Sequence, residues 1–181
     1  MTIADAEIIQ IPIWPGCNDM KIKGNIMPLA LEQEVIDLLN NDTTIKIIAS
    51  IDGEGVPHIE VKQSLHLGSD GQIHLLEFHE YSTTSKNLVR SIWFNRPLAI
   101  LLRGADGHCI QVKGRAVKNH ISGSLFQQHY SRVRDEFGDI DLAGVWIVEP
   151  DEIIDQGYEQ NPYFLASENA TYIHLDRIAR A

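Results

Sequence analysis

Turn-forming clusters divide the middle of this sequence into short apolar segments. Asp52–Gly55, Gly68–Gly71 and Gly104–Gly107 each combine glycine with Asp or Glu, and such residues tolerate the positive φ angles that tight hairpin turns need. The segments on either side are rich in Ile, Leu and Val, and in several of them apolar and polar residues alternate. This pattern predicts antiparallel strands joined by tight turns.

We expect six strands. The first arm of the first hairpin shows the alternation well, because Ile45, Ile47, Ala49 and Ile51 alternate with Lys46, Ile48 and Ser50. The expected strands are Ile45–Ile51, Val56–Leu67, Ile73–Phe78, Leu98–Leu102, Ile110–Ala116 and Val145–Ile147, the last one ending at the Glu149-Pro150 break.

Three helices are expected between these strands. The first runs from Pro28 to Asn41, the second opens at the hydroxyl cluster Ser82–Ser85 and ends before Arg96-Pro97, and the third lies between Ser122 and Gly138. Parallel βαβ units need a helix after nearly every strand. The sequence therefore predicts a mainly β protein with short helices, built as a small six-stranded antiparallel barrel whose closure removes exposed sheet edges.

The chain is predicted to form one domain with two extensions. With 181 residues, of which 44% are hydrophobic and 22% charged, it can bury one full core. We expect an N-terminal extension over residues 1–27, the barrel domain over residues 28–157 and a C-terminal extension over residues 158–181.

Charge and hydropathy argue against several partners. The 15 Lys and Arg face 25 Asp and Glu, and the resulting net charge of −10 would repel a nucleic-acid backbone. Apolar runs have strand length, short of the ~20 residues that span a bilayer, and the first residues carry Asp5 and Glu7 without the basic start of a secretory signal. The two cysteines, Cys17 and Cys109, form no CxxC pair. We expect a cytoplasmic protein with free thiols that binds neither nucleic acid nor membrane.

Three short motifs stand in the expected strands and helix. Gly55-Val56-Pro57-His58 opens the second strand, Ser85-Lys86-Asn87-Leu88 lies at the start of the second helix, and the fifth strand reads Gln111-Val112-Lys113-Gly114-Arg115-Ala116. In order and spacing the chain resembles the FMN-binding split barrels related to pyridoxamine 5'-phosphate oxidase. The resemblance covers roughly residues 38–154 and implies a split β-barrel, an FMN cofactor and a homodimer.

The sequence departs from the true pyridoxamine phosphate oxidases. Where those carry an Arg followed by Leu-Leu-Lys, this chain reads Ile59-Glu60-Val61-Lys62-Gln63, and their Ser-Arg-Lys reads Thr84-Ser85-Lys86. The C-terminal arginine-bearing motif that engages pyridoxal phosphate is not recognisable in residues 158–181. The resemblance therefore supports FMN binding more than that particular oxidase.

The second helix supplies a candidate phosphate site. Thr83, Thr84, Ser85 and Lys86 combine hydroxyls, an amine and the positive end of a helix dipole. The competing interpretation is a simple N-cap beside a solvated lysine. With the family resemblance, we expect these four residues to bind the FMN phosphate.

Other cofactor contacts follow from the resemblance. The second strand would run beneath the isoalloxazine ring, with Lys62 placing charge near it and Gln63 or Ser64 donating hydrogen bonds. Because alternate strand residues face opposite sides, at least one of these three is expected to be a bystander. Gln111 matches a Gln that reaches the flavin from the second subunit, although it could equally be an exposed barrel residue.

Aromatic and histidine residues give weaker signals. Trp93 and Trp146 lie at apolar-periodic positions and are expected in the core or an interface. Pairing His74 with His79, or His120 with His129, matches no zinc-binding spacing, and we predict no metal site. Haem is an alternative to FMN, because some split-barrel relatives bind it.

The leading hypothesis is an FMN-dependent oxidoreductase that acts on an unidentified small molecule or electron donor. No catalytic residue is assigned, since the flavin itself supplies the chemistry. The alternatives are a non-catalytic flavin-binding or electron-carrying module, and a barrel without a ligand. A small barrel is filled by its own side chains, so the flavin would lie outside it and be covered by a second subunit.

Overall fold

The computed structural model describes residues 29–157. The two predicted extensions, residues 1–27 and 158–181, lie outside the described residues, and so does Pro28, the expected start of the domain. Seven strands form one antiparallel sheet in the order β2-β1-β5-β6-β7-β4-β3. They are β1 (Ile45–Ile51), β2 (Pro57–Val61), β3 (Leu65–Leu67), β4 (Ile73–Glu77), β5 (Leu98–Arg103), β6 (Cys109–His120) and β7 (Gly144–Asp155).

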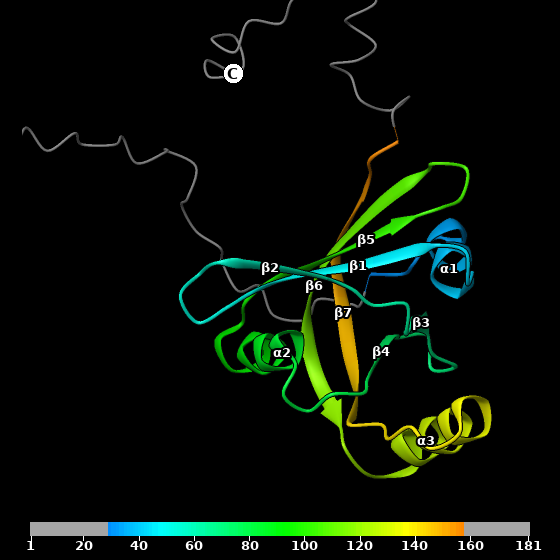
Figure 1. The fold of residues 1–181 in the computed structure, drawn as a ribbon. Coiled ribbons are helices and arrows are strands. Elements are labelled where there is room, and N and C mark those ends of the chain that lie inside the picture. Colours follow the sequence, from blue (N-terminus) through cyan, green and yellow to red (C-terminus); the bar gives the residue numbers. More distant parts are fainter. Residues whose placement is uncertain (1–28, 158–181) are drawn as a thin grey trace, which may run out of the picture.

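The sheet curls because its two end strands are consecutive in the chain. β2 and β3 stand at opposite ends of the strand order, yet only residues 62–64 separate them. So short a connection forces the ends of the sheet toward each other, and Figure 1 shows the resulting half-barrel. The predicted mainly β, antiparallel, split-barrel architecture is confirmed in this form.

The prediction of six strands was wrong, because the expected strand Val56–Leu67 is two strands. Lys62 N–H donates to the carbonyl of Lys46 at 2.8 Å, and Leu65 N–H then donates to the carbonyl of Lys62 at 3.1 Å, which closes a turn. The chain leaves β1 at this point and pairs with β4 instead. No glycine or proline marks the break, and the strand propensity continues through it, so the sequence did not predict it.

The last strand also runs further than predicted. β7 continues through Pro150 to Asp155, paired with β6, while β4 pairs with it only as far as Val148. Pro150 lacks an amide hydrogen, but it lies opposite Gly114 at a register shift of β6. A Cβ on Gly114 would lie 2.2 Å from the carbonyl oxygen of Glu149, so this close approach of two backbones requires glycine.

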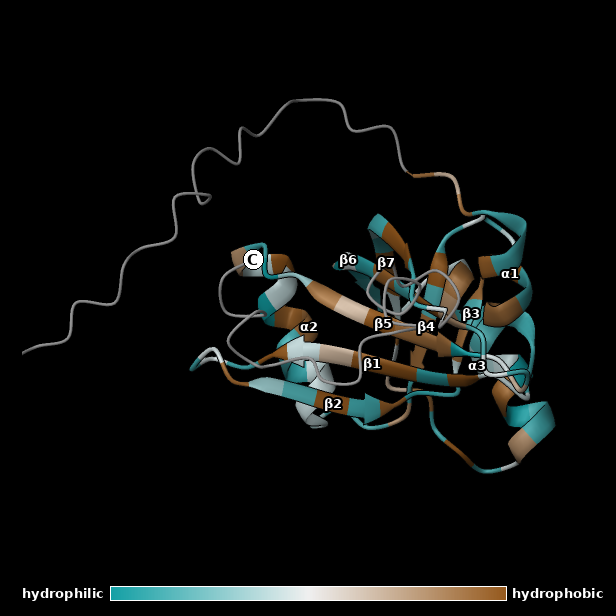
Figure 2. Ribbon diagram, turned by 90° about the horizontal axis from the view of Figure 1, so that it is seen from above, coloured by the Kyte–Doolittle hydropathy of each residue, from teal (hydrophilic) through white to brown (hydrophobic). Residues whose placement is uncertain are grey.

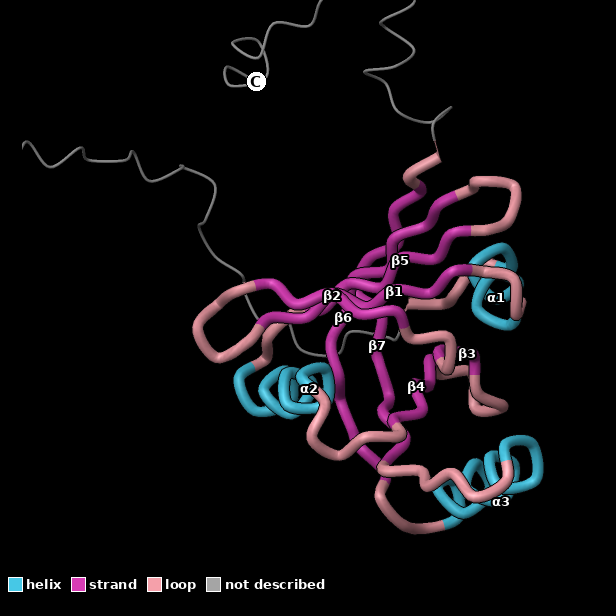
Figure 3. The backbone as a smooth tube through the Cα atoms, viewed as in Figure 1, coloured by secondary structure: helices cyan, strands magenta, loops and turns pink. Residues whose placement is uncertain are grey.

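Three helices pack around the sheet (Figure 3). α1 (Gln33–Asn40) contacts β3 and β5, α2 (Thr83–Phe94) contacts β6, β1 and β2, and α3 (Ser124–Phe137) contacts β7. All three were predicted, with ends that differ by a few residues. Within residues 29–157 no helix is long and apolar enough to cross a membrane.

The main core lies inside the curl. Hydrophobic residues are concentrated on the strands, whereas α1 and α3 carry hydrophilic turns at the periphery (Figure 2). Val35 and Leu39 of α1, Leu88 of α2 and the strand residue Trp146 all belong to this core. Trp146 is 1% exposed, which confirms the expectation that it is a core residue, whereas Trp93 is 77% exposed.

Candidate functional site

The N-terminus of α2 is fixed by a side-chain cap. Ser82 is the N-cap residue, and its Oγ accepts a hydrogen bond from Ser85 N–H at 2.9 Å. The same hydroxyl donates to Glu77 Oε2 at 2.9 Å. The predicted capping interaction is therefore present, and it ties the start of α2 to the end of β4.

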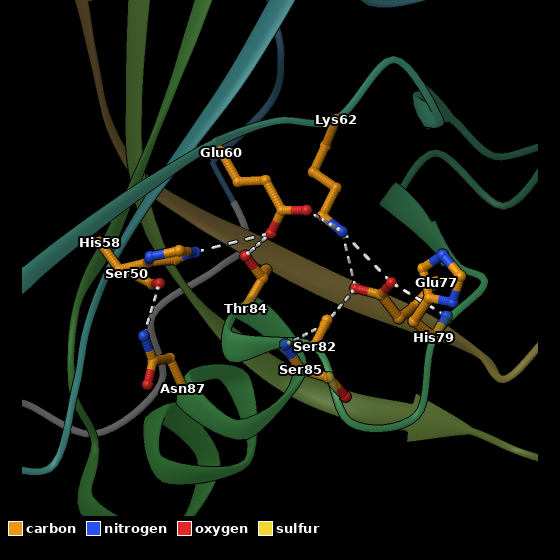
Figure 4. A network of polar contacts seen from close by, with 10 residues as sticks. All are labelled: Ser50, His58, Glu60, Lys62, Glu77, His79, Ser82, Thr84, Ser85 and Asn87. Carbon is orange, nitrogen blue, oxygen red and sulfur yellow. Dashed lines mark hydrogen bonds and ion pairs between the residues drawn. The ribbon is translucent and has the colours of Figure 1, made fainter.

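A buried lysine joins β2 to β4 beside this cap (Figure 4). Lys62 Nζ lies 3.0 Å from Glu60 Oε1 and 3.0 Å from Glu77 Oε2. The side chain of Glu77 is 2% exposed and that of Lys62 is 10% exposed, whereas Glu60 is 37% exposed. Two carboxylates thus share one ammonium group, and only Glu60 has ready access to solvent.

Glu60 is held from several sides. The hydroxyl of Thr84 donates to Glu60 Oε2, and His58 Nε2 lies 3.6 Å from the same oxygen. Burial by itself would raise the pKa of the Glu60 carboxyl, but hydrogen bonds from Thr84 and Lys62 outweigh it, and the pKa lies below its ordinary value. Glu60 is therefore an anion that occupies the donors of Lys62 and Thr84.

The alternation along β2 places His58 and Glu60, and the turn that follows this strand places Lys62. His58, Glu60 and Lys62 point toward α2 (Figure 4), while Ile59 and Val61 on the opposite face are 67% and 59% exposed. The edge strand therefore turns its polar residues inward and its apolar residues outward, the reverse of an ordinary amphipathic strand.

The structure brings together Lys62, Thr84 and Ser85 of the predicted cofactor residues. Thr83 and Lys86 lie on the exposed face of α2, while Thr84 and Ser85 are buried. Asn87, from the motif that carries the resemblance, is also buried and donates to Ser50 Oγ at 3.1 Å.

Gln63 and Ser64 make structural contacts instead. Lys62, Gln63 and Ser64 lie in the turn between β2 and β3 and not in a strand, so the expected alternation of faces does not apply to them. Gln63 accepts from Lys46 N–H at 2.9 Å and donates to the Thr44 carbonyl at 3.0 Å, while Ser64 Oγ donates to the Leu76 carbonyl at 2.7 Å. Their polar groups bind the turn to β1 and β4.

Gln111 lies on β6 near the other end of β7. Its Oε1 accepts from Gln156 Nε2 at 2.6 Å, and it pairs across the strands with Leu101 and Ile154. It is not part of the network around Lys62 within one chain, and its predicted reach to a second subunit's flavin stays a prediction.

The sequence interpretation missed Glu60, Glu77 and Ser82 as site residues. The sequence held a signal for Glu77, because it is a charged residue that ends the apolar run after Ile73, a position that predicts burial, and the structure leaves it 2% exposed. Buried carboxylates usually need a partner, so a search for a nearby cation would have led to Lys62.

Two hollows flank the network. One of about 230 Å³ is lined by Glu77, Ser85, Asn119 and Trp146, among others. Asn119 Oδ1 and Trp146 Nε1 are buried there without a hydrogen-bond partner among the described residues. The other, about 760 Å³, lies beyond the turn of Gln63 and Ser64 and reaches α3.

The described residues form a curled antiparallel half-barrel with a polar network at the N-terminus of α2. No protein-family model matches the chain, and no curated protein matches it. Among solved structures it is similar to HupZ of Group A Streptococcus, with 21% identity, 70% of this chain and 94% of that chain covered, and a TM-score of 0.58.

It is also similar to an FMN-binding protein of Syntrophomonas wolfei, with 16% identity, 67% and 83% of the two chains covered and a TM-score of 0.56. For a proposed pyridoxamine 5'-phosphate oxidase of Lactobacillus delbrueckii the identity is 18%, the coverage 69% and 93%, and the TM-score 0.53. The chain thus has the split-barrel fold that the sequence resemblance implied.

Proposed function

We propose that this protein binds FMN at the N-terminus of α2, in a site completed by a second copy of the chain, and acts as a flavin-dependent oxidoreductase on a small molecule. The observation that carries the proposal is the convergence of Lys62, Thr84 and the capped start of α2. It occurs in a fold that an FMN-binding protein of Syntrophomonas wolfei shares.

The start of α2 suits a phosphate group. The first amides of a helix have no intrahelical acceptor, and the helix dipole favours an anion there. The Thr84 hydroxyl and the Lys62 ammonium add a neutral and a charged donor at the same place. In the proposal Lys62 therefore contacts the phosphate and not the ring, which differs from the role that the sequence resemblance suggested.

Glu60 determines how the phosphate can enter. Its carboxylate occupies the donors of Lys62 and Thr84, so it and a phosphate cannot both be bound there. Because its side chain is 37% exposed, it can rotate into solvent, while the buried Glu77 keeps Lys62 in position. The site fits FMN phosphate once Glu60 has turned away.

Bound FMN would supply hydride or single-electron chemistry. Residues of this chain would orient it: Asn119 Oδ1 and Trp146 Nε1 offer a buried acceptor and a buried donor beside Ser85, and both lack a partner among residues 29–157. An unpaired buried polar atom is costly, so these two atoms suit a ligand with complementary polar groups.

A second copy of the chain would cover the exposed apolar residues of β2 and α2, the two elements that supply Lys62's neighbours and the helix start. Ile59 and Val61 of β2 are 67% and 59% exposed, and Trp93 and Phe94 of α2 are 77% and 69% exposed. Large exposed apolar side chains on neighbouring elements are typical of an interface. We therefore propose a symmetric homodimer through β2 and α2, with Gln111 as a candidate contact to the flavin of the other subunit. A cytoplasmic location remains part of the proposal.

The proposal is tested by ligand titration of the purified protein with FMN and with riboflavin, which lacks the phosphate. We expect FMN to bind at least tenfold more tightly than riboflavin, and Thr84→Val to weaken FMN by the roughly 1 to 2 kcal/mol of a hydrogen bond to a charged group without changing riboflavin binding. Lys62→Met removes the proposed charged donor and should also weaken FMN binding. Lys113→Met, at an exposed ion pair on β6, is its matched control. Equal affinity for both ligands in the wild type would contradict the phosphate site.

The same sample separates the alternative functions. A Soret band in the absorption spectrum would indicate haem instead of flavin. If FMN is bound, rapid reduction by NADH or NADPH and transfer to one acceptor indicate an oxidoreductase, whereas flavin that no donor reduces indicates a binding or carrier module. A colourless protein that binds no FMN would indicate the third alternative, a barrel without a flavin ligand.

A further inference from the structure

Three histidines from three separate elements meet away from the α2 network. His66 lies on β3, His74 on β4 and His129 on α3. Their ring centroids are 5.2 to 5.5 Å apart, and one coordinating nitrogen of each lies within 4.8 Å of the others. His74 and His129 are buried and His66 is partly buried. The sequence interpretation considered His74 and His129 separately, each with a different partner.

Hydrogen bonds on the far side of two rings fix their tautomers. His66 Nδ1 lies 2.8 Å from the carbonyl oxygen of Ser64, so it must be the protonated nitrogen, which leaves the lone pair on Nε2. His74 Nε2 lies 3.0 Å from a carboxylate oxygen of Asp70, which favours the proton on Nε2 and leaves the lone pair on Nδ1. This Nδ1 lies 3.2 Å from His129 Nε2.

These free nitrogens are poorly satisfied by the protein itself. Within residues 29–157, His66 Nε2 is buried and has no hydrogen-bond partner, while His74 Nδ1 and His129 Nε2 contact each other at 3.2 Å. Burial and the neighbouring imidazoles also lower the pKa of His66, and they lower that of His129 to about 4. Neutral imidazole is the form that binds metal ions.

A glycine allows the cluster to form. A Cβ on Gly68 would lie 2.2 Å from His74 Cε1 and 2.5 Å from His74 Nε2. The turn after β3 therefore approaches the face of the His74 ring so closely that only glycine fits. The same turn carries Asp70, which holds the outer nitrogen of that ring.

We propose that His66, His74 and His129 bind one divalent transition-metal ion, with Asp70 as the residue that orients His74. Imidazole nitrogens suit zinc, and a carboxylate on the outer nitrogen of a ligating histidine is a common arrangement at such sites. Tetrahedral bonds of about 2.0 to 2.1 Å place two ligand nitrogens roughly 3.3 Å apart. His74 Nδ1 and His129 Nε2 are 3.2 Å apart, close to this spacing, and the ligand nitrogen of His66 lies within 4.8 Å of both.

Three protein ligands leave a fourth position. His66 also lines the hollow of about 760 Å³, together with Arg132 and Glu136 of α3. Water or a small anion could reach the ion from that side. Because the cluster has no residue in common with the Lys62 network, the proposal does not depend on FMN binding.

Zinc binding to protein without a histidine tag, after dialysis against a chelator, tests this proposal. We expect one Zn²⁺ per chain at micromolar or tighter affinity, a rise in the melting temperature on adding Zn²⁺, and a Co²⁺ spectrum of tetrahedral intensity. His66→Gln and His129→Gln should each lower the affinity for Zn²⁺ at least 100-fold, and Asp70→Asn should lower it about 10- to 100-fold. His108→Gln, a histidine near α1 and the end of β7, is the control and should bind normally.

Either of two results would overturn the proposal and would mean that the three histidines only form hydrogen bonds with the protein. One is a wild-type protein whose melting temperature and Co²⁺ spectrum do not respond to stoichiometric metal. The other is undiminished Zn²⁺ affinity in both His66→Gln and His129→Gln. The first measurement uses only the wild-type chain, so it decides the question even if the variants fold poorly.

Discussion

The ammonium group of Lys62 lies 3.0 Å from Glu77 Oε2, and Glu77 is only 2% exposed. This ion pair connects the turn after β2 to the end of β4, and Glu77 also accepts the hydroxyl of the α2 cap, Ser82. One buried carboxylate therefore holds together the three elements that build the proposed flavin site.

Removing the cation should destabilise the protein. Lys62→Met leaves Glu77 buried without its charge partner, which costs about 3 kcal/mol of unfolding free energy. Lys113→Met at the exposed pair with Glu152 should cost at most about 1 kcal/mol. Urea unfolding of both variants without added ligand measures the difference, and equal losses would show that the Lys62 pair is no stronger than a surface pair.

Neutralising Glu60 should tighten FMN binding if the phosphate occupies the proposed site. Glu60→Gln removes a negative charge that competes for Lys62 and Thr84, and we expect about tenfold higher FMN affinity, equal to ~1.4 kcal/mol. Riboflavin affinity should not change, because riboflavin has no phosphate. Fluorescence titration with both ligands checks this, and weaker FMN binding would mean that Glu60 itself contacts the flavin.

A methyl group at Gly68 should disturb the histidine cluster. Gly68→Ala places its Cβ against the His74 ring, and we expect a loss of roughly 1 to 3 kcal/mol of stability from overpacking together with weaker Zn²⁺ binding. Gly53→Ala is the control, since the nearest atoms there belong to the flexible Arg90 side chain at 3.3 Å. Thermal unfolding with and without Zn²⁺ compares the two, and the idea fails if they behave alike.

The sequence predicted the features that depend on neighbours in the chain. The alternation in Ile45–Ile51 and the hydroxyls of Ser82–Ser85 encode a strand and a capped helix locally, and both are present. The break at Lys62 was missed because it depends on a hydrogen bond to Lys46, 16 positions earlier in the chain. Nothing in residues 56–67 taken alone favours ending the strand there.

Which residues make up the two sites was predictable only in part, because several of them come together through contacts between distant parts of the chain. Thr84 and Ser85 follow from the helix start, but Glu60 and Glu77 meet only because the sheet curls. His66 and His74 come together through the β3–β4 pair, and His129 joins them from a helix 55 positions beyond His74. Spacing rules for metal ligands apply to single helices and turns, so they did not detect this set.

Acid should weaken the β1–β2 hairpin. Asp52 Oδ1 accepts N–H groups of Glu54 and Val56, both at 2.9 Å, and the Val56 hydrogen bond is the main reason that the pKa of Asp52 lies below its ordinary value. Such a carboxylate adds stability above its unfolded pKa of about 3.9, and that contribution is lost as the pH falls through the lower folded pKa.

We therefore expect Asp52→Asn to melt at a lower temperature than the wild type at pH 7, with the difference disappearing as the pH falls below about 3.9. Asp106→Asn, in the β5–β6 turn where the carboxylate accepts only His108 N–H at 3.0 Å among the described contacts, should have a smaller effect. Melting curves from pH 7 to pH 3 test this. A difference that persists unchanged at pH 3 would show that ionisation is not its source.

The last prediction concerns assembly through β2. This strand lies at one end of the strand order, its polar residues face α2, and Ile59 and Val61 are exposed on the other face. An end strand with an apolar outer face tends to associate with another chain, and a two-fold symmetric dimer would bury this face in both copies. Ile59→Glu should convert the proposed dimer to a monomer. Because the site is proposed to be shared between two chains, the same substitution should lower the affinity for FMN at least tenfold. Phe137→Glu, on α3 and 58% exposed, should do neither. Light scattering with quantified flavin measures both quantities. A variant that stays dimeric would place the interface elsewhere, and a monomer that keeps wild-type FMN affinity would show that one chain completes the site alone.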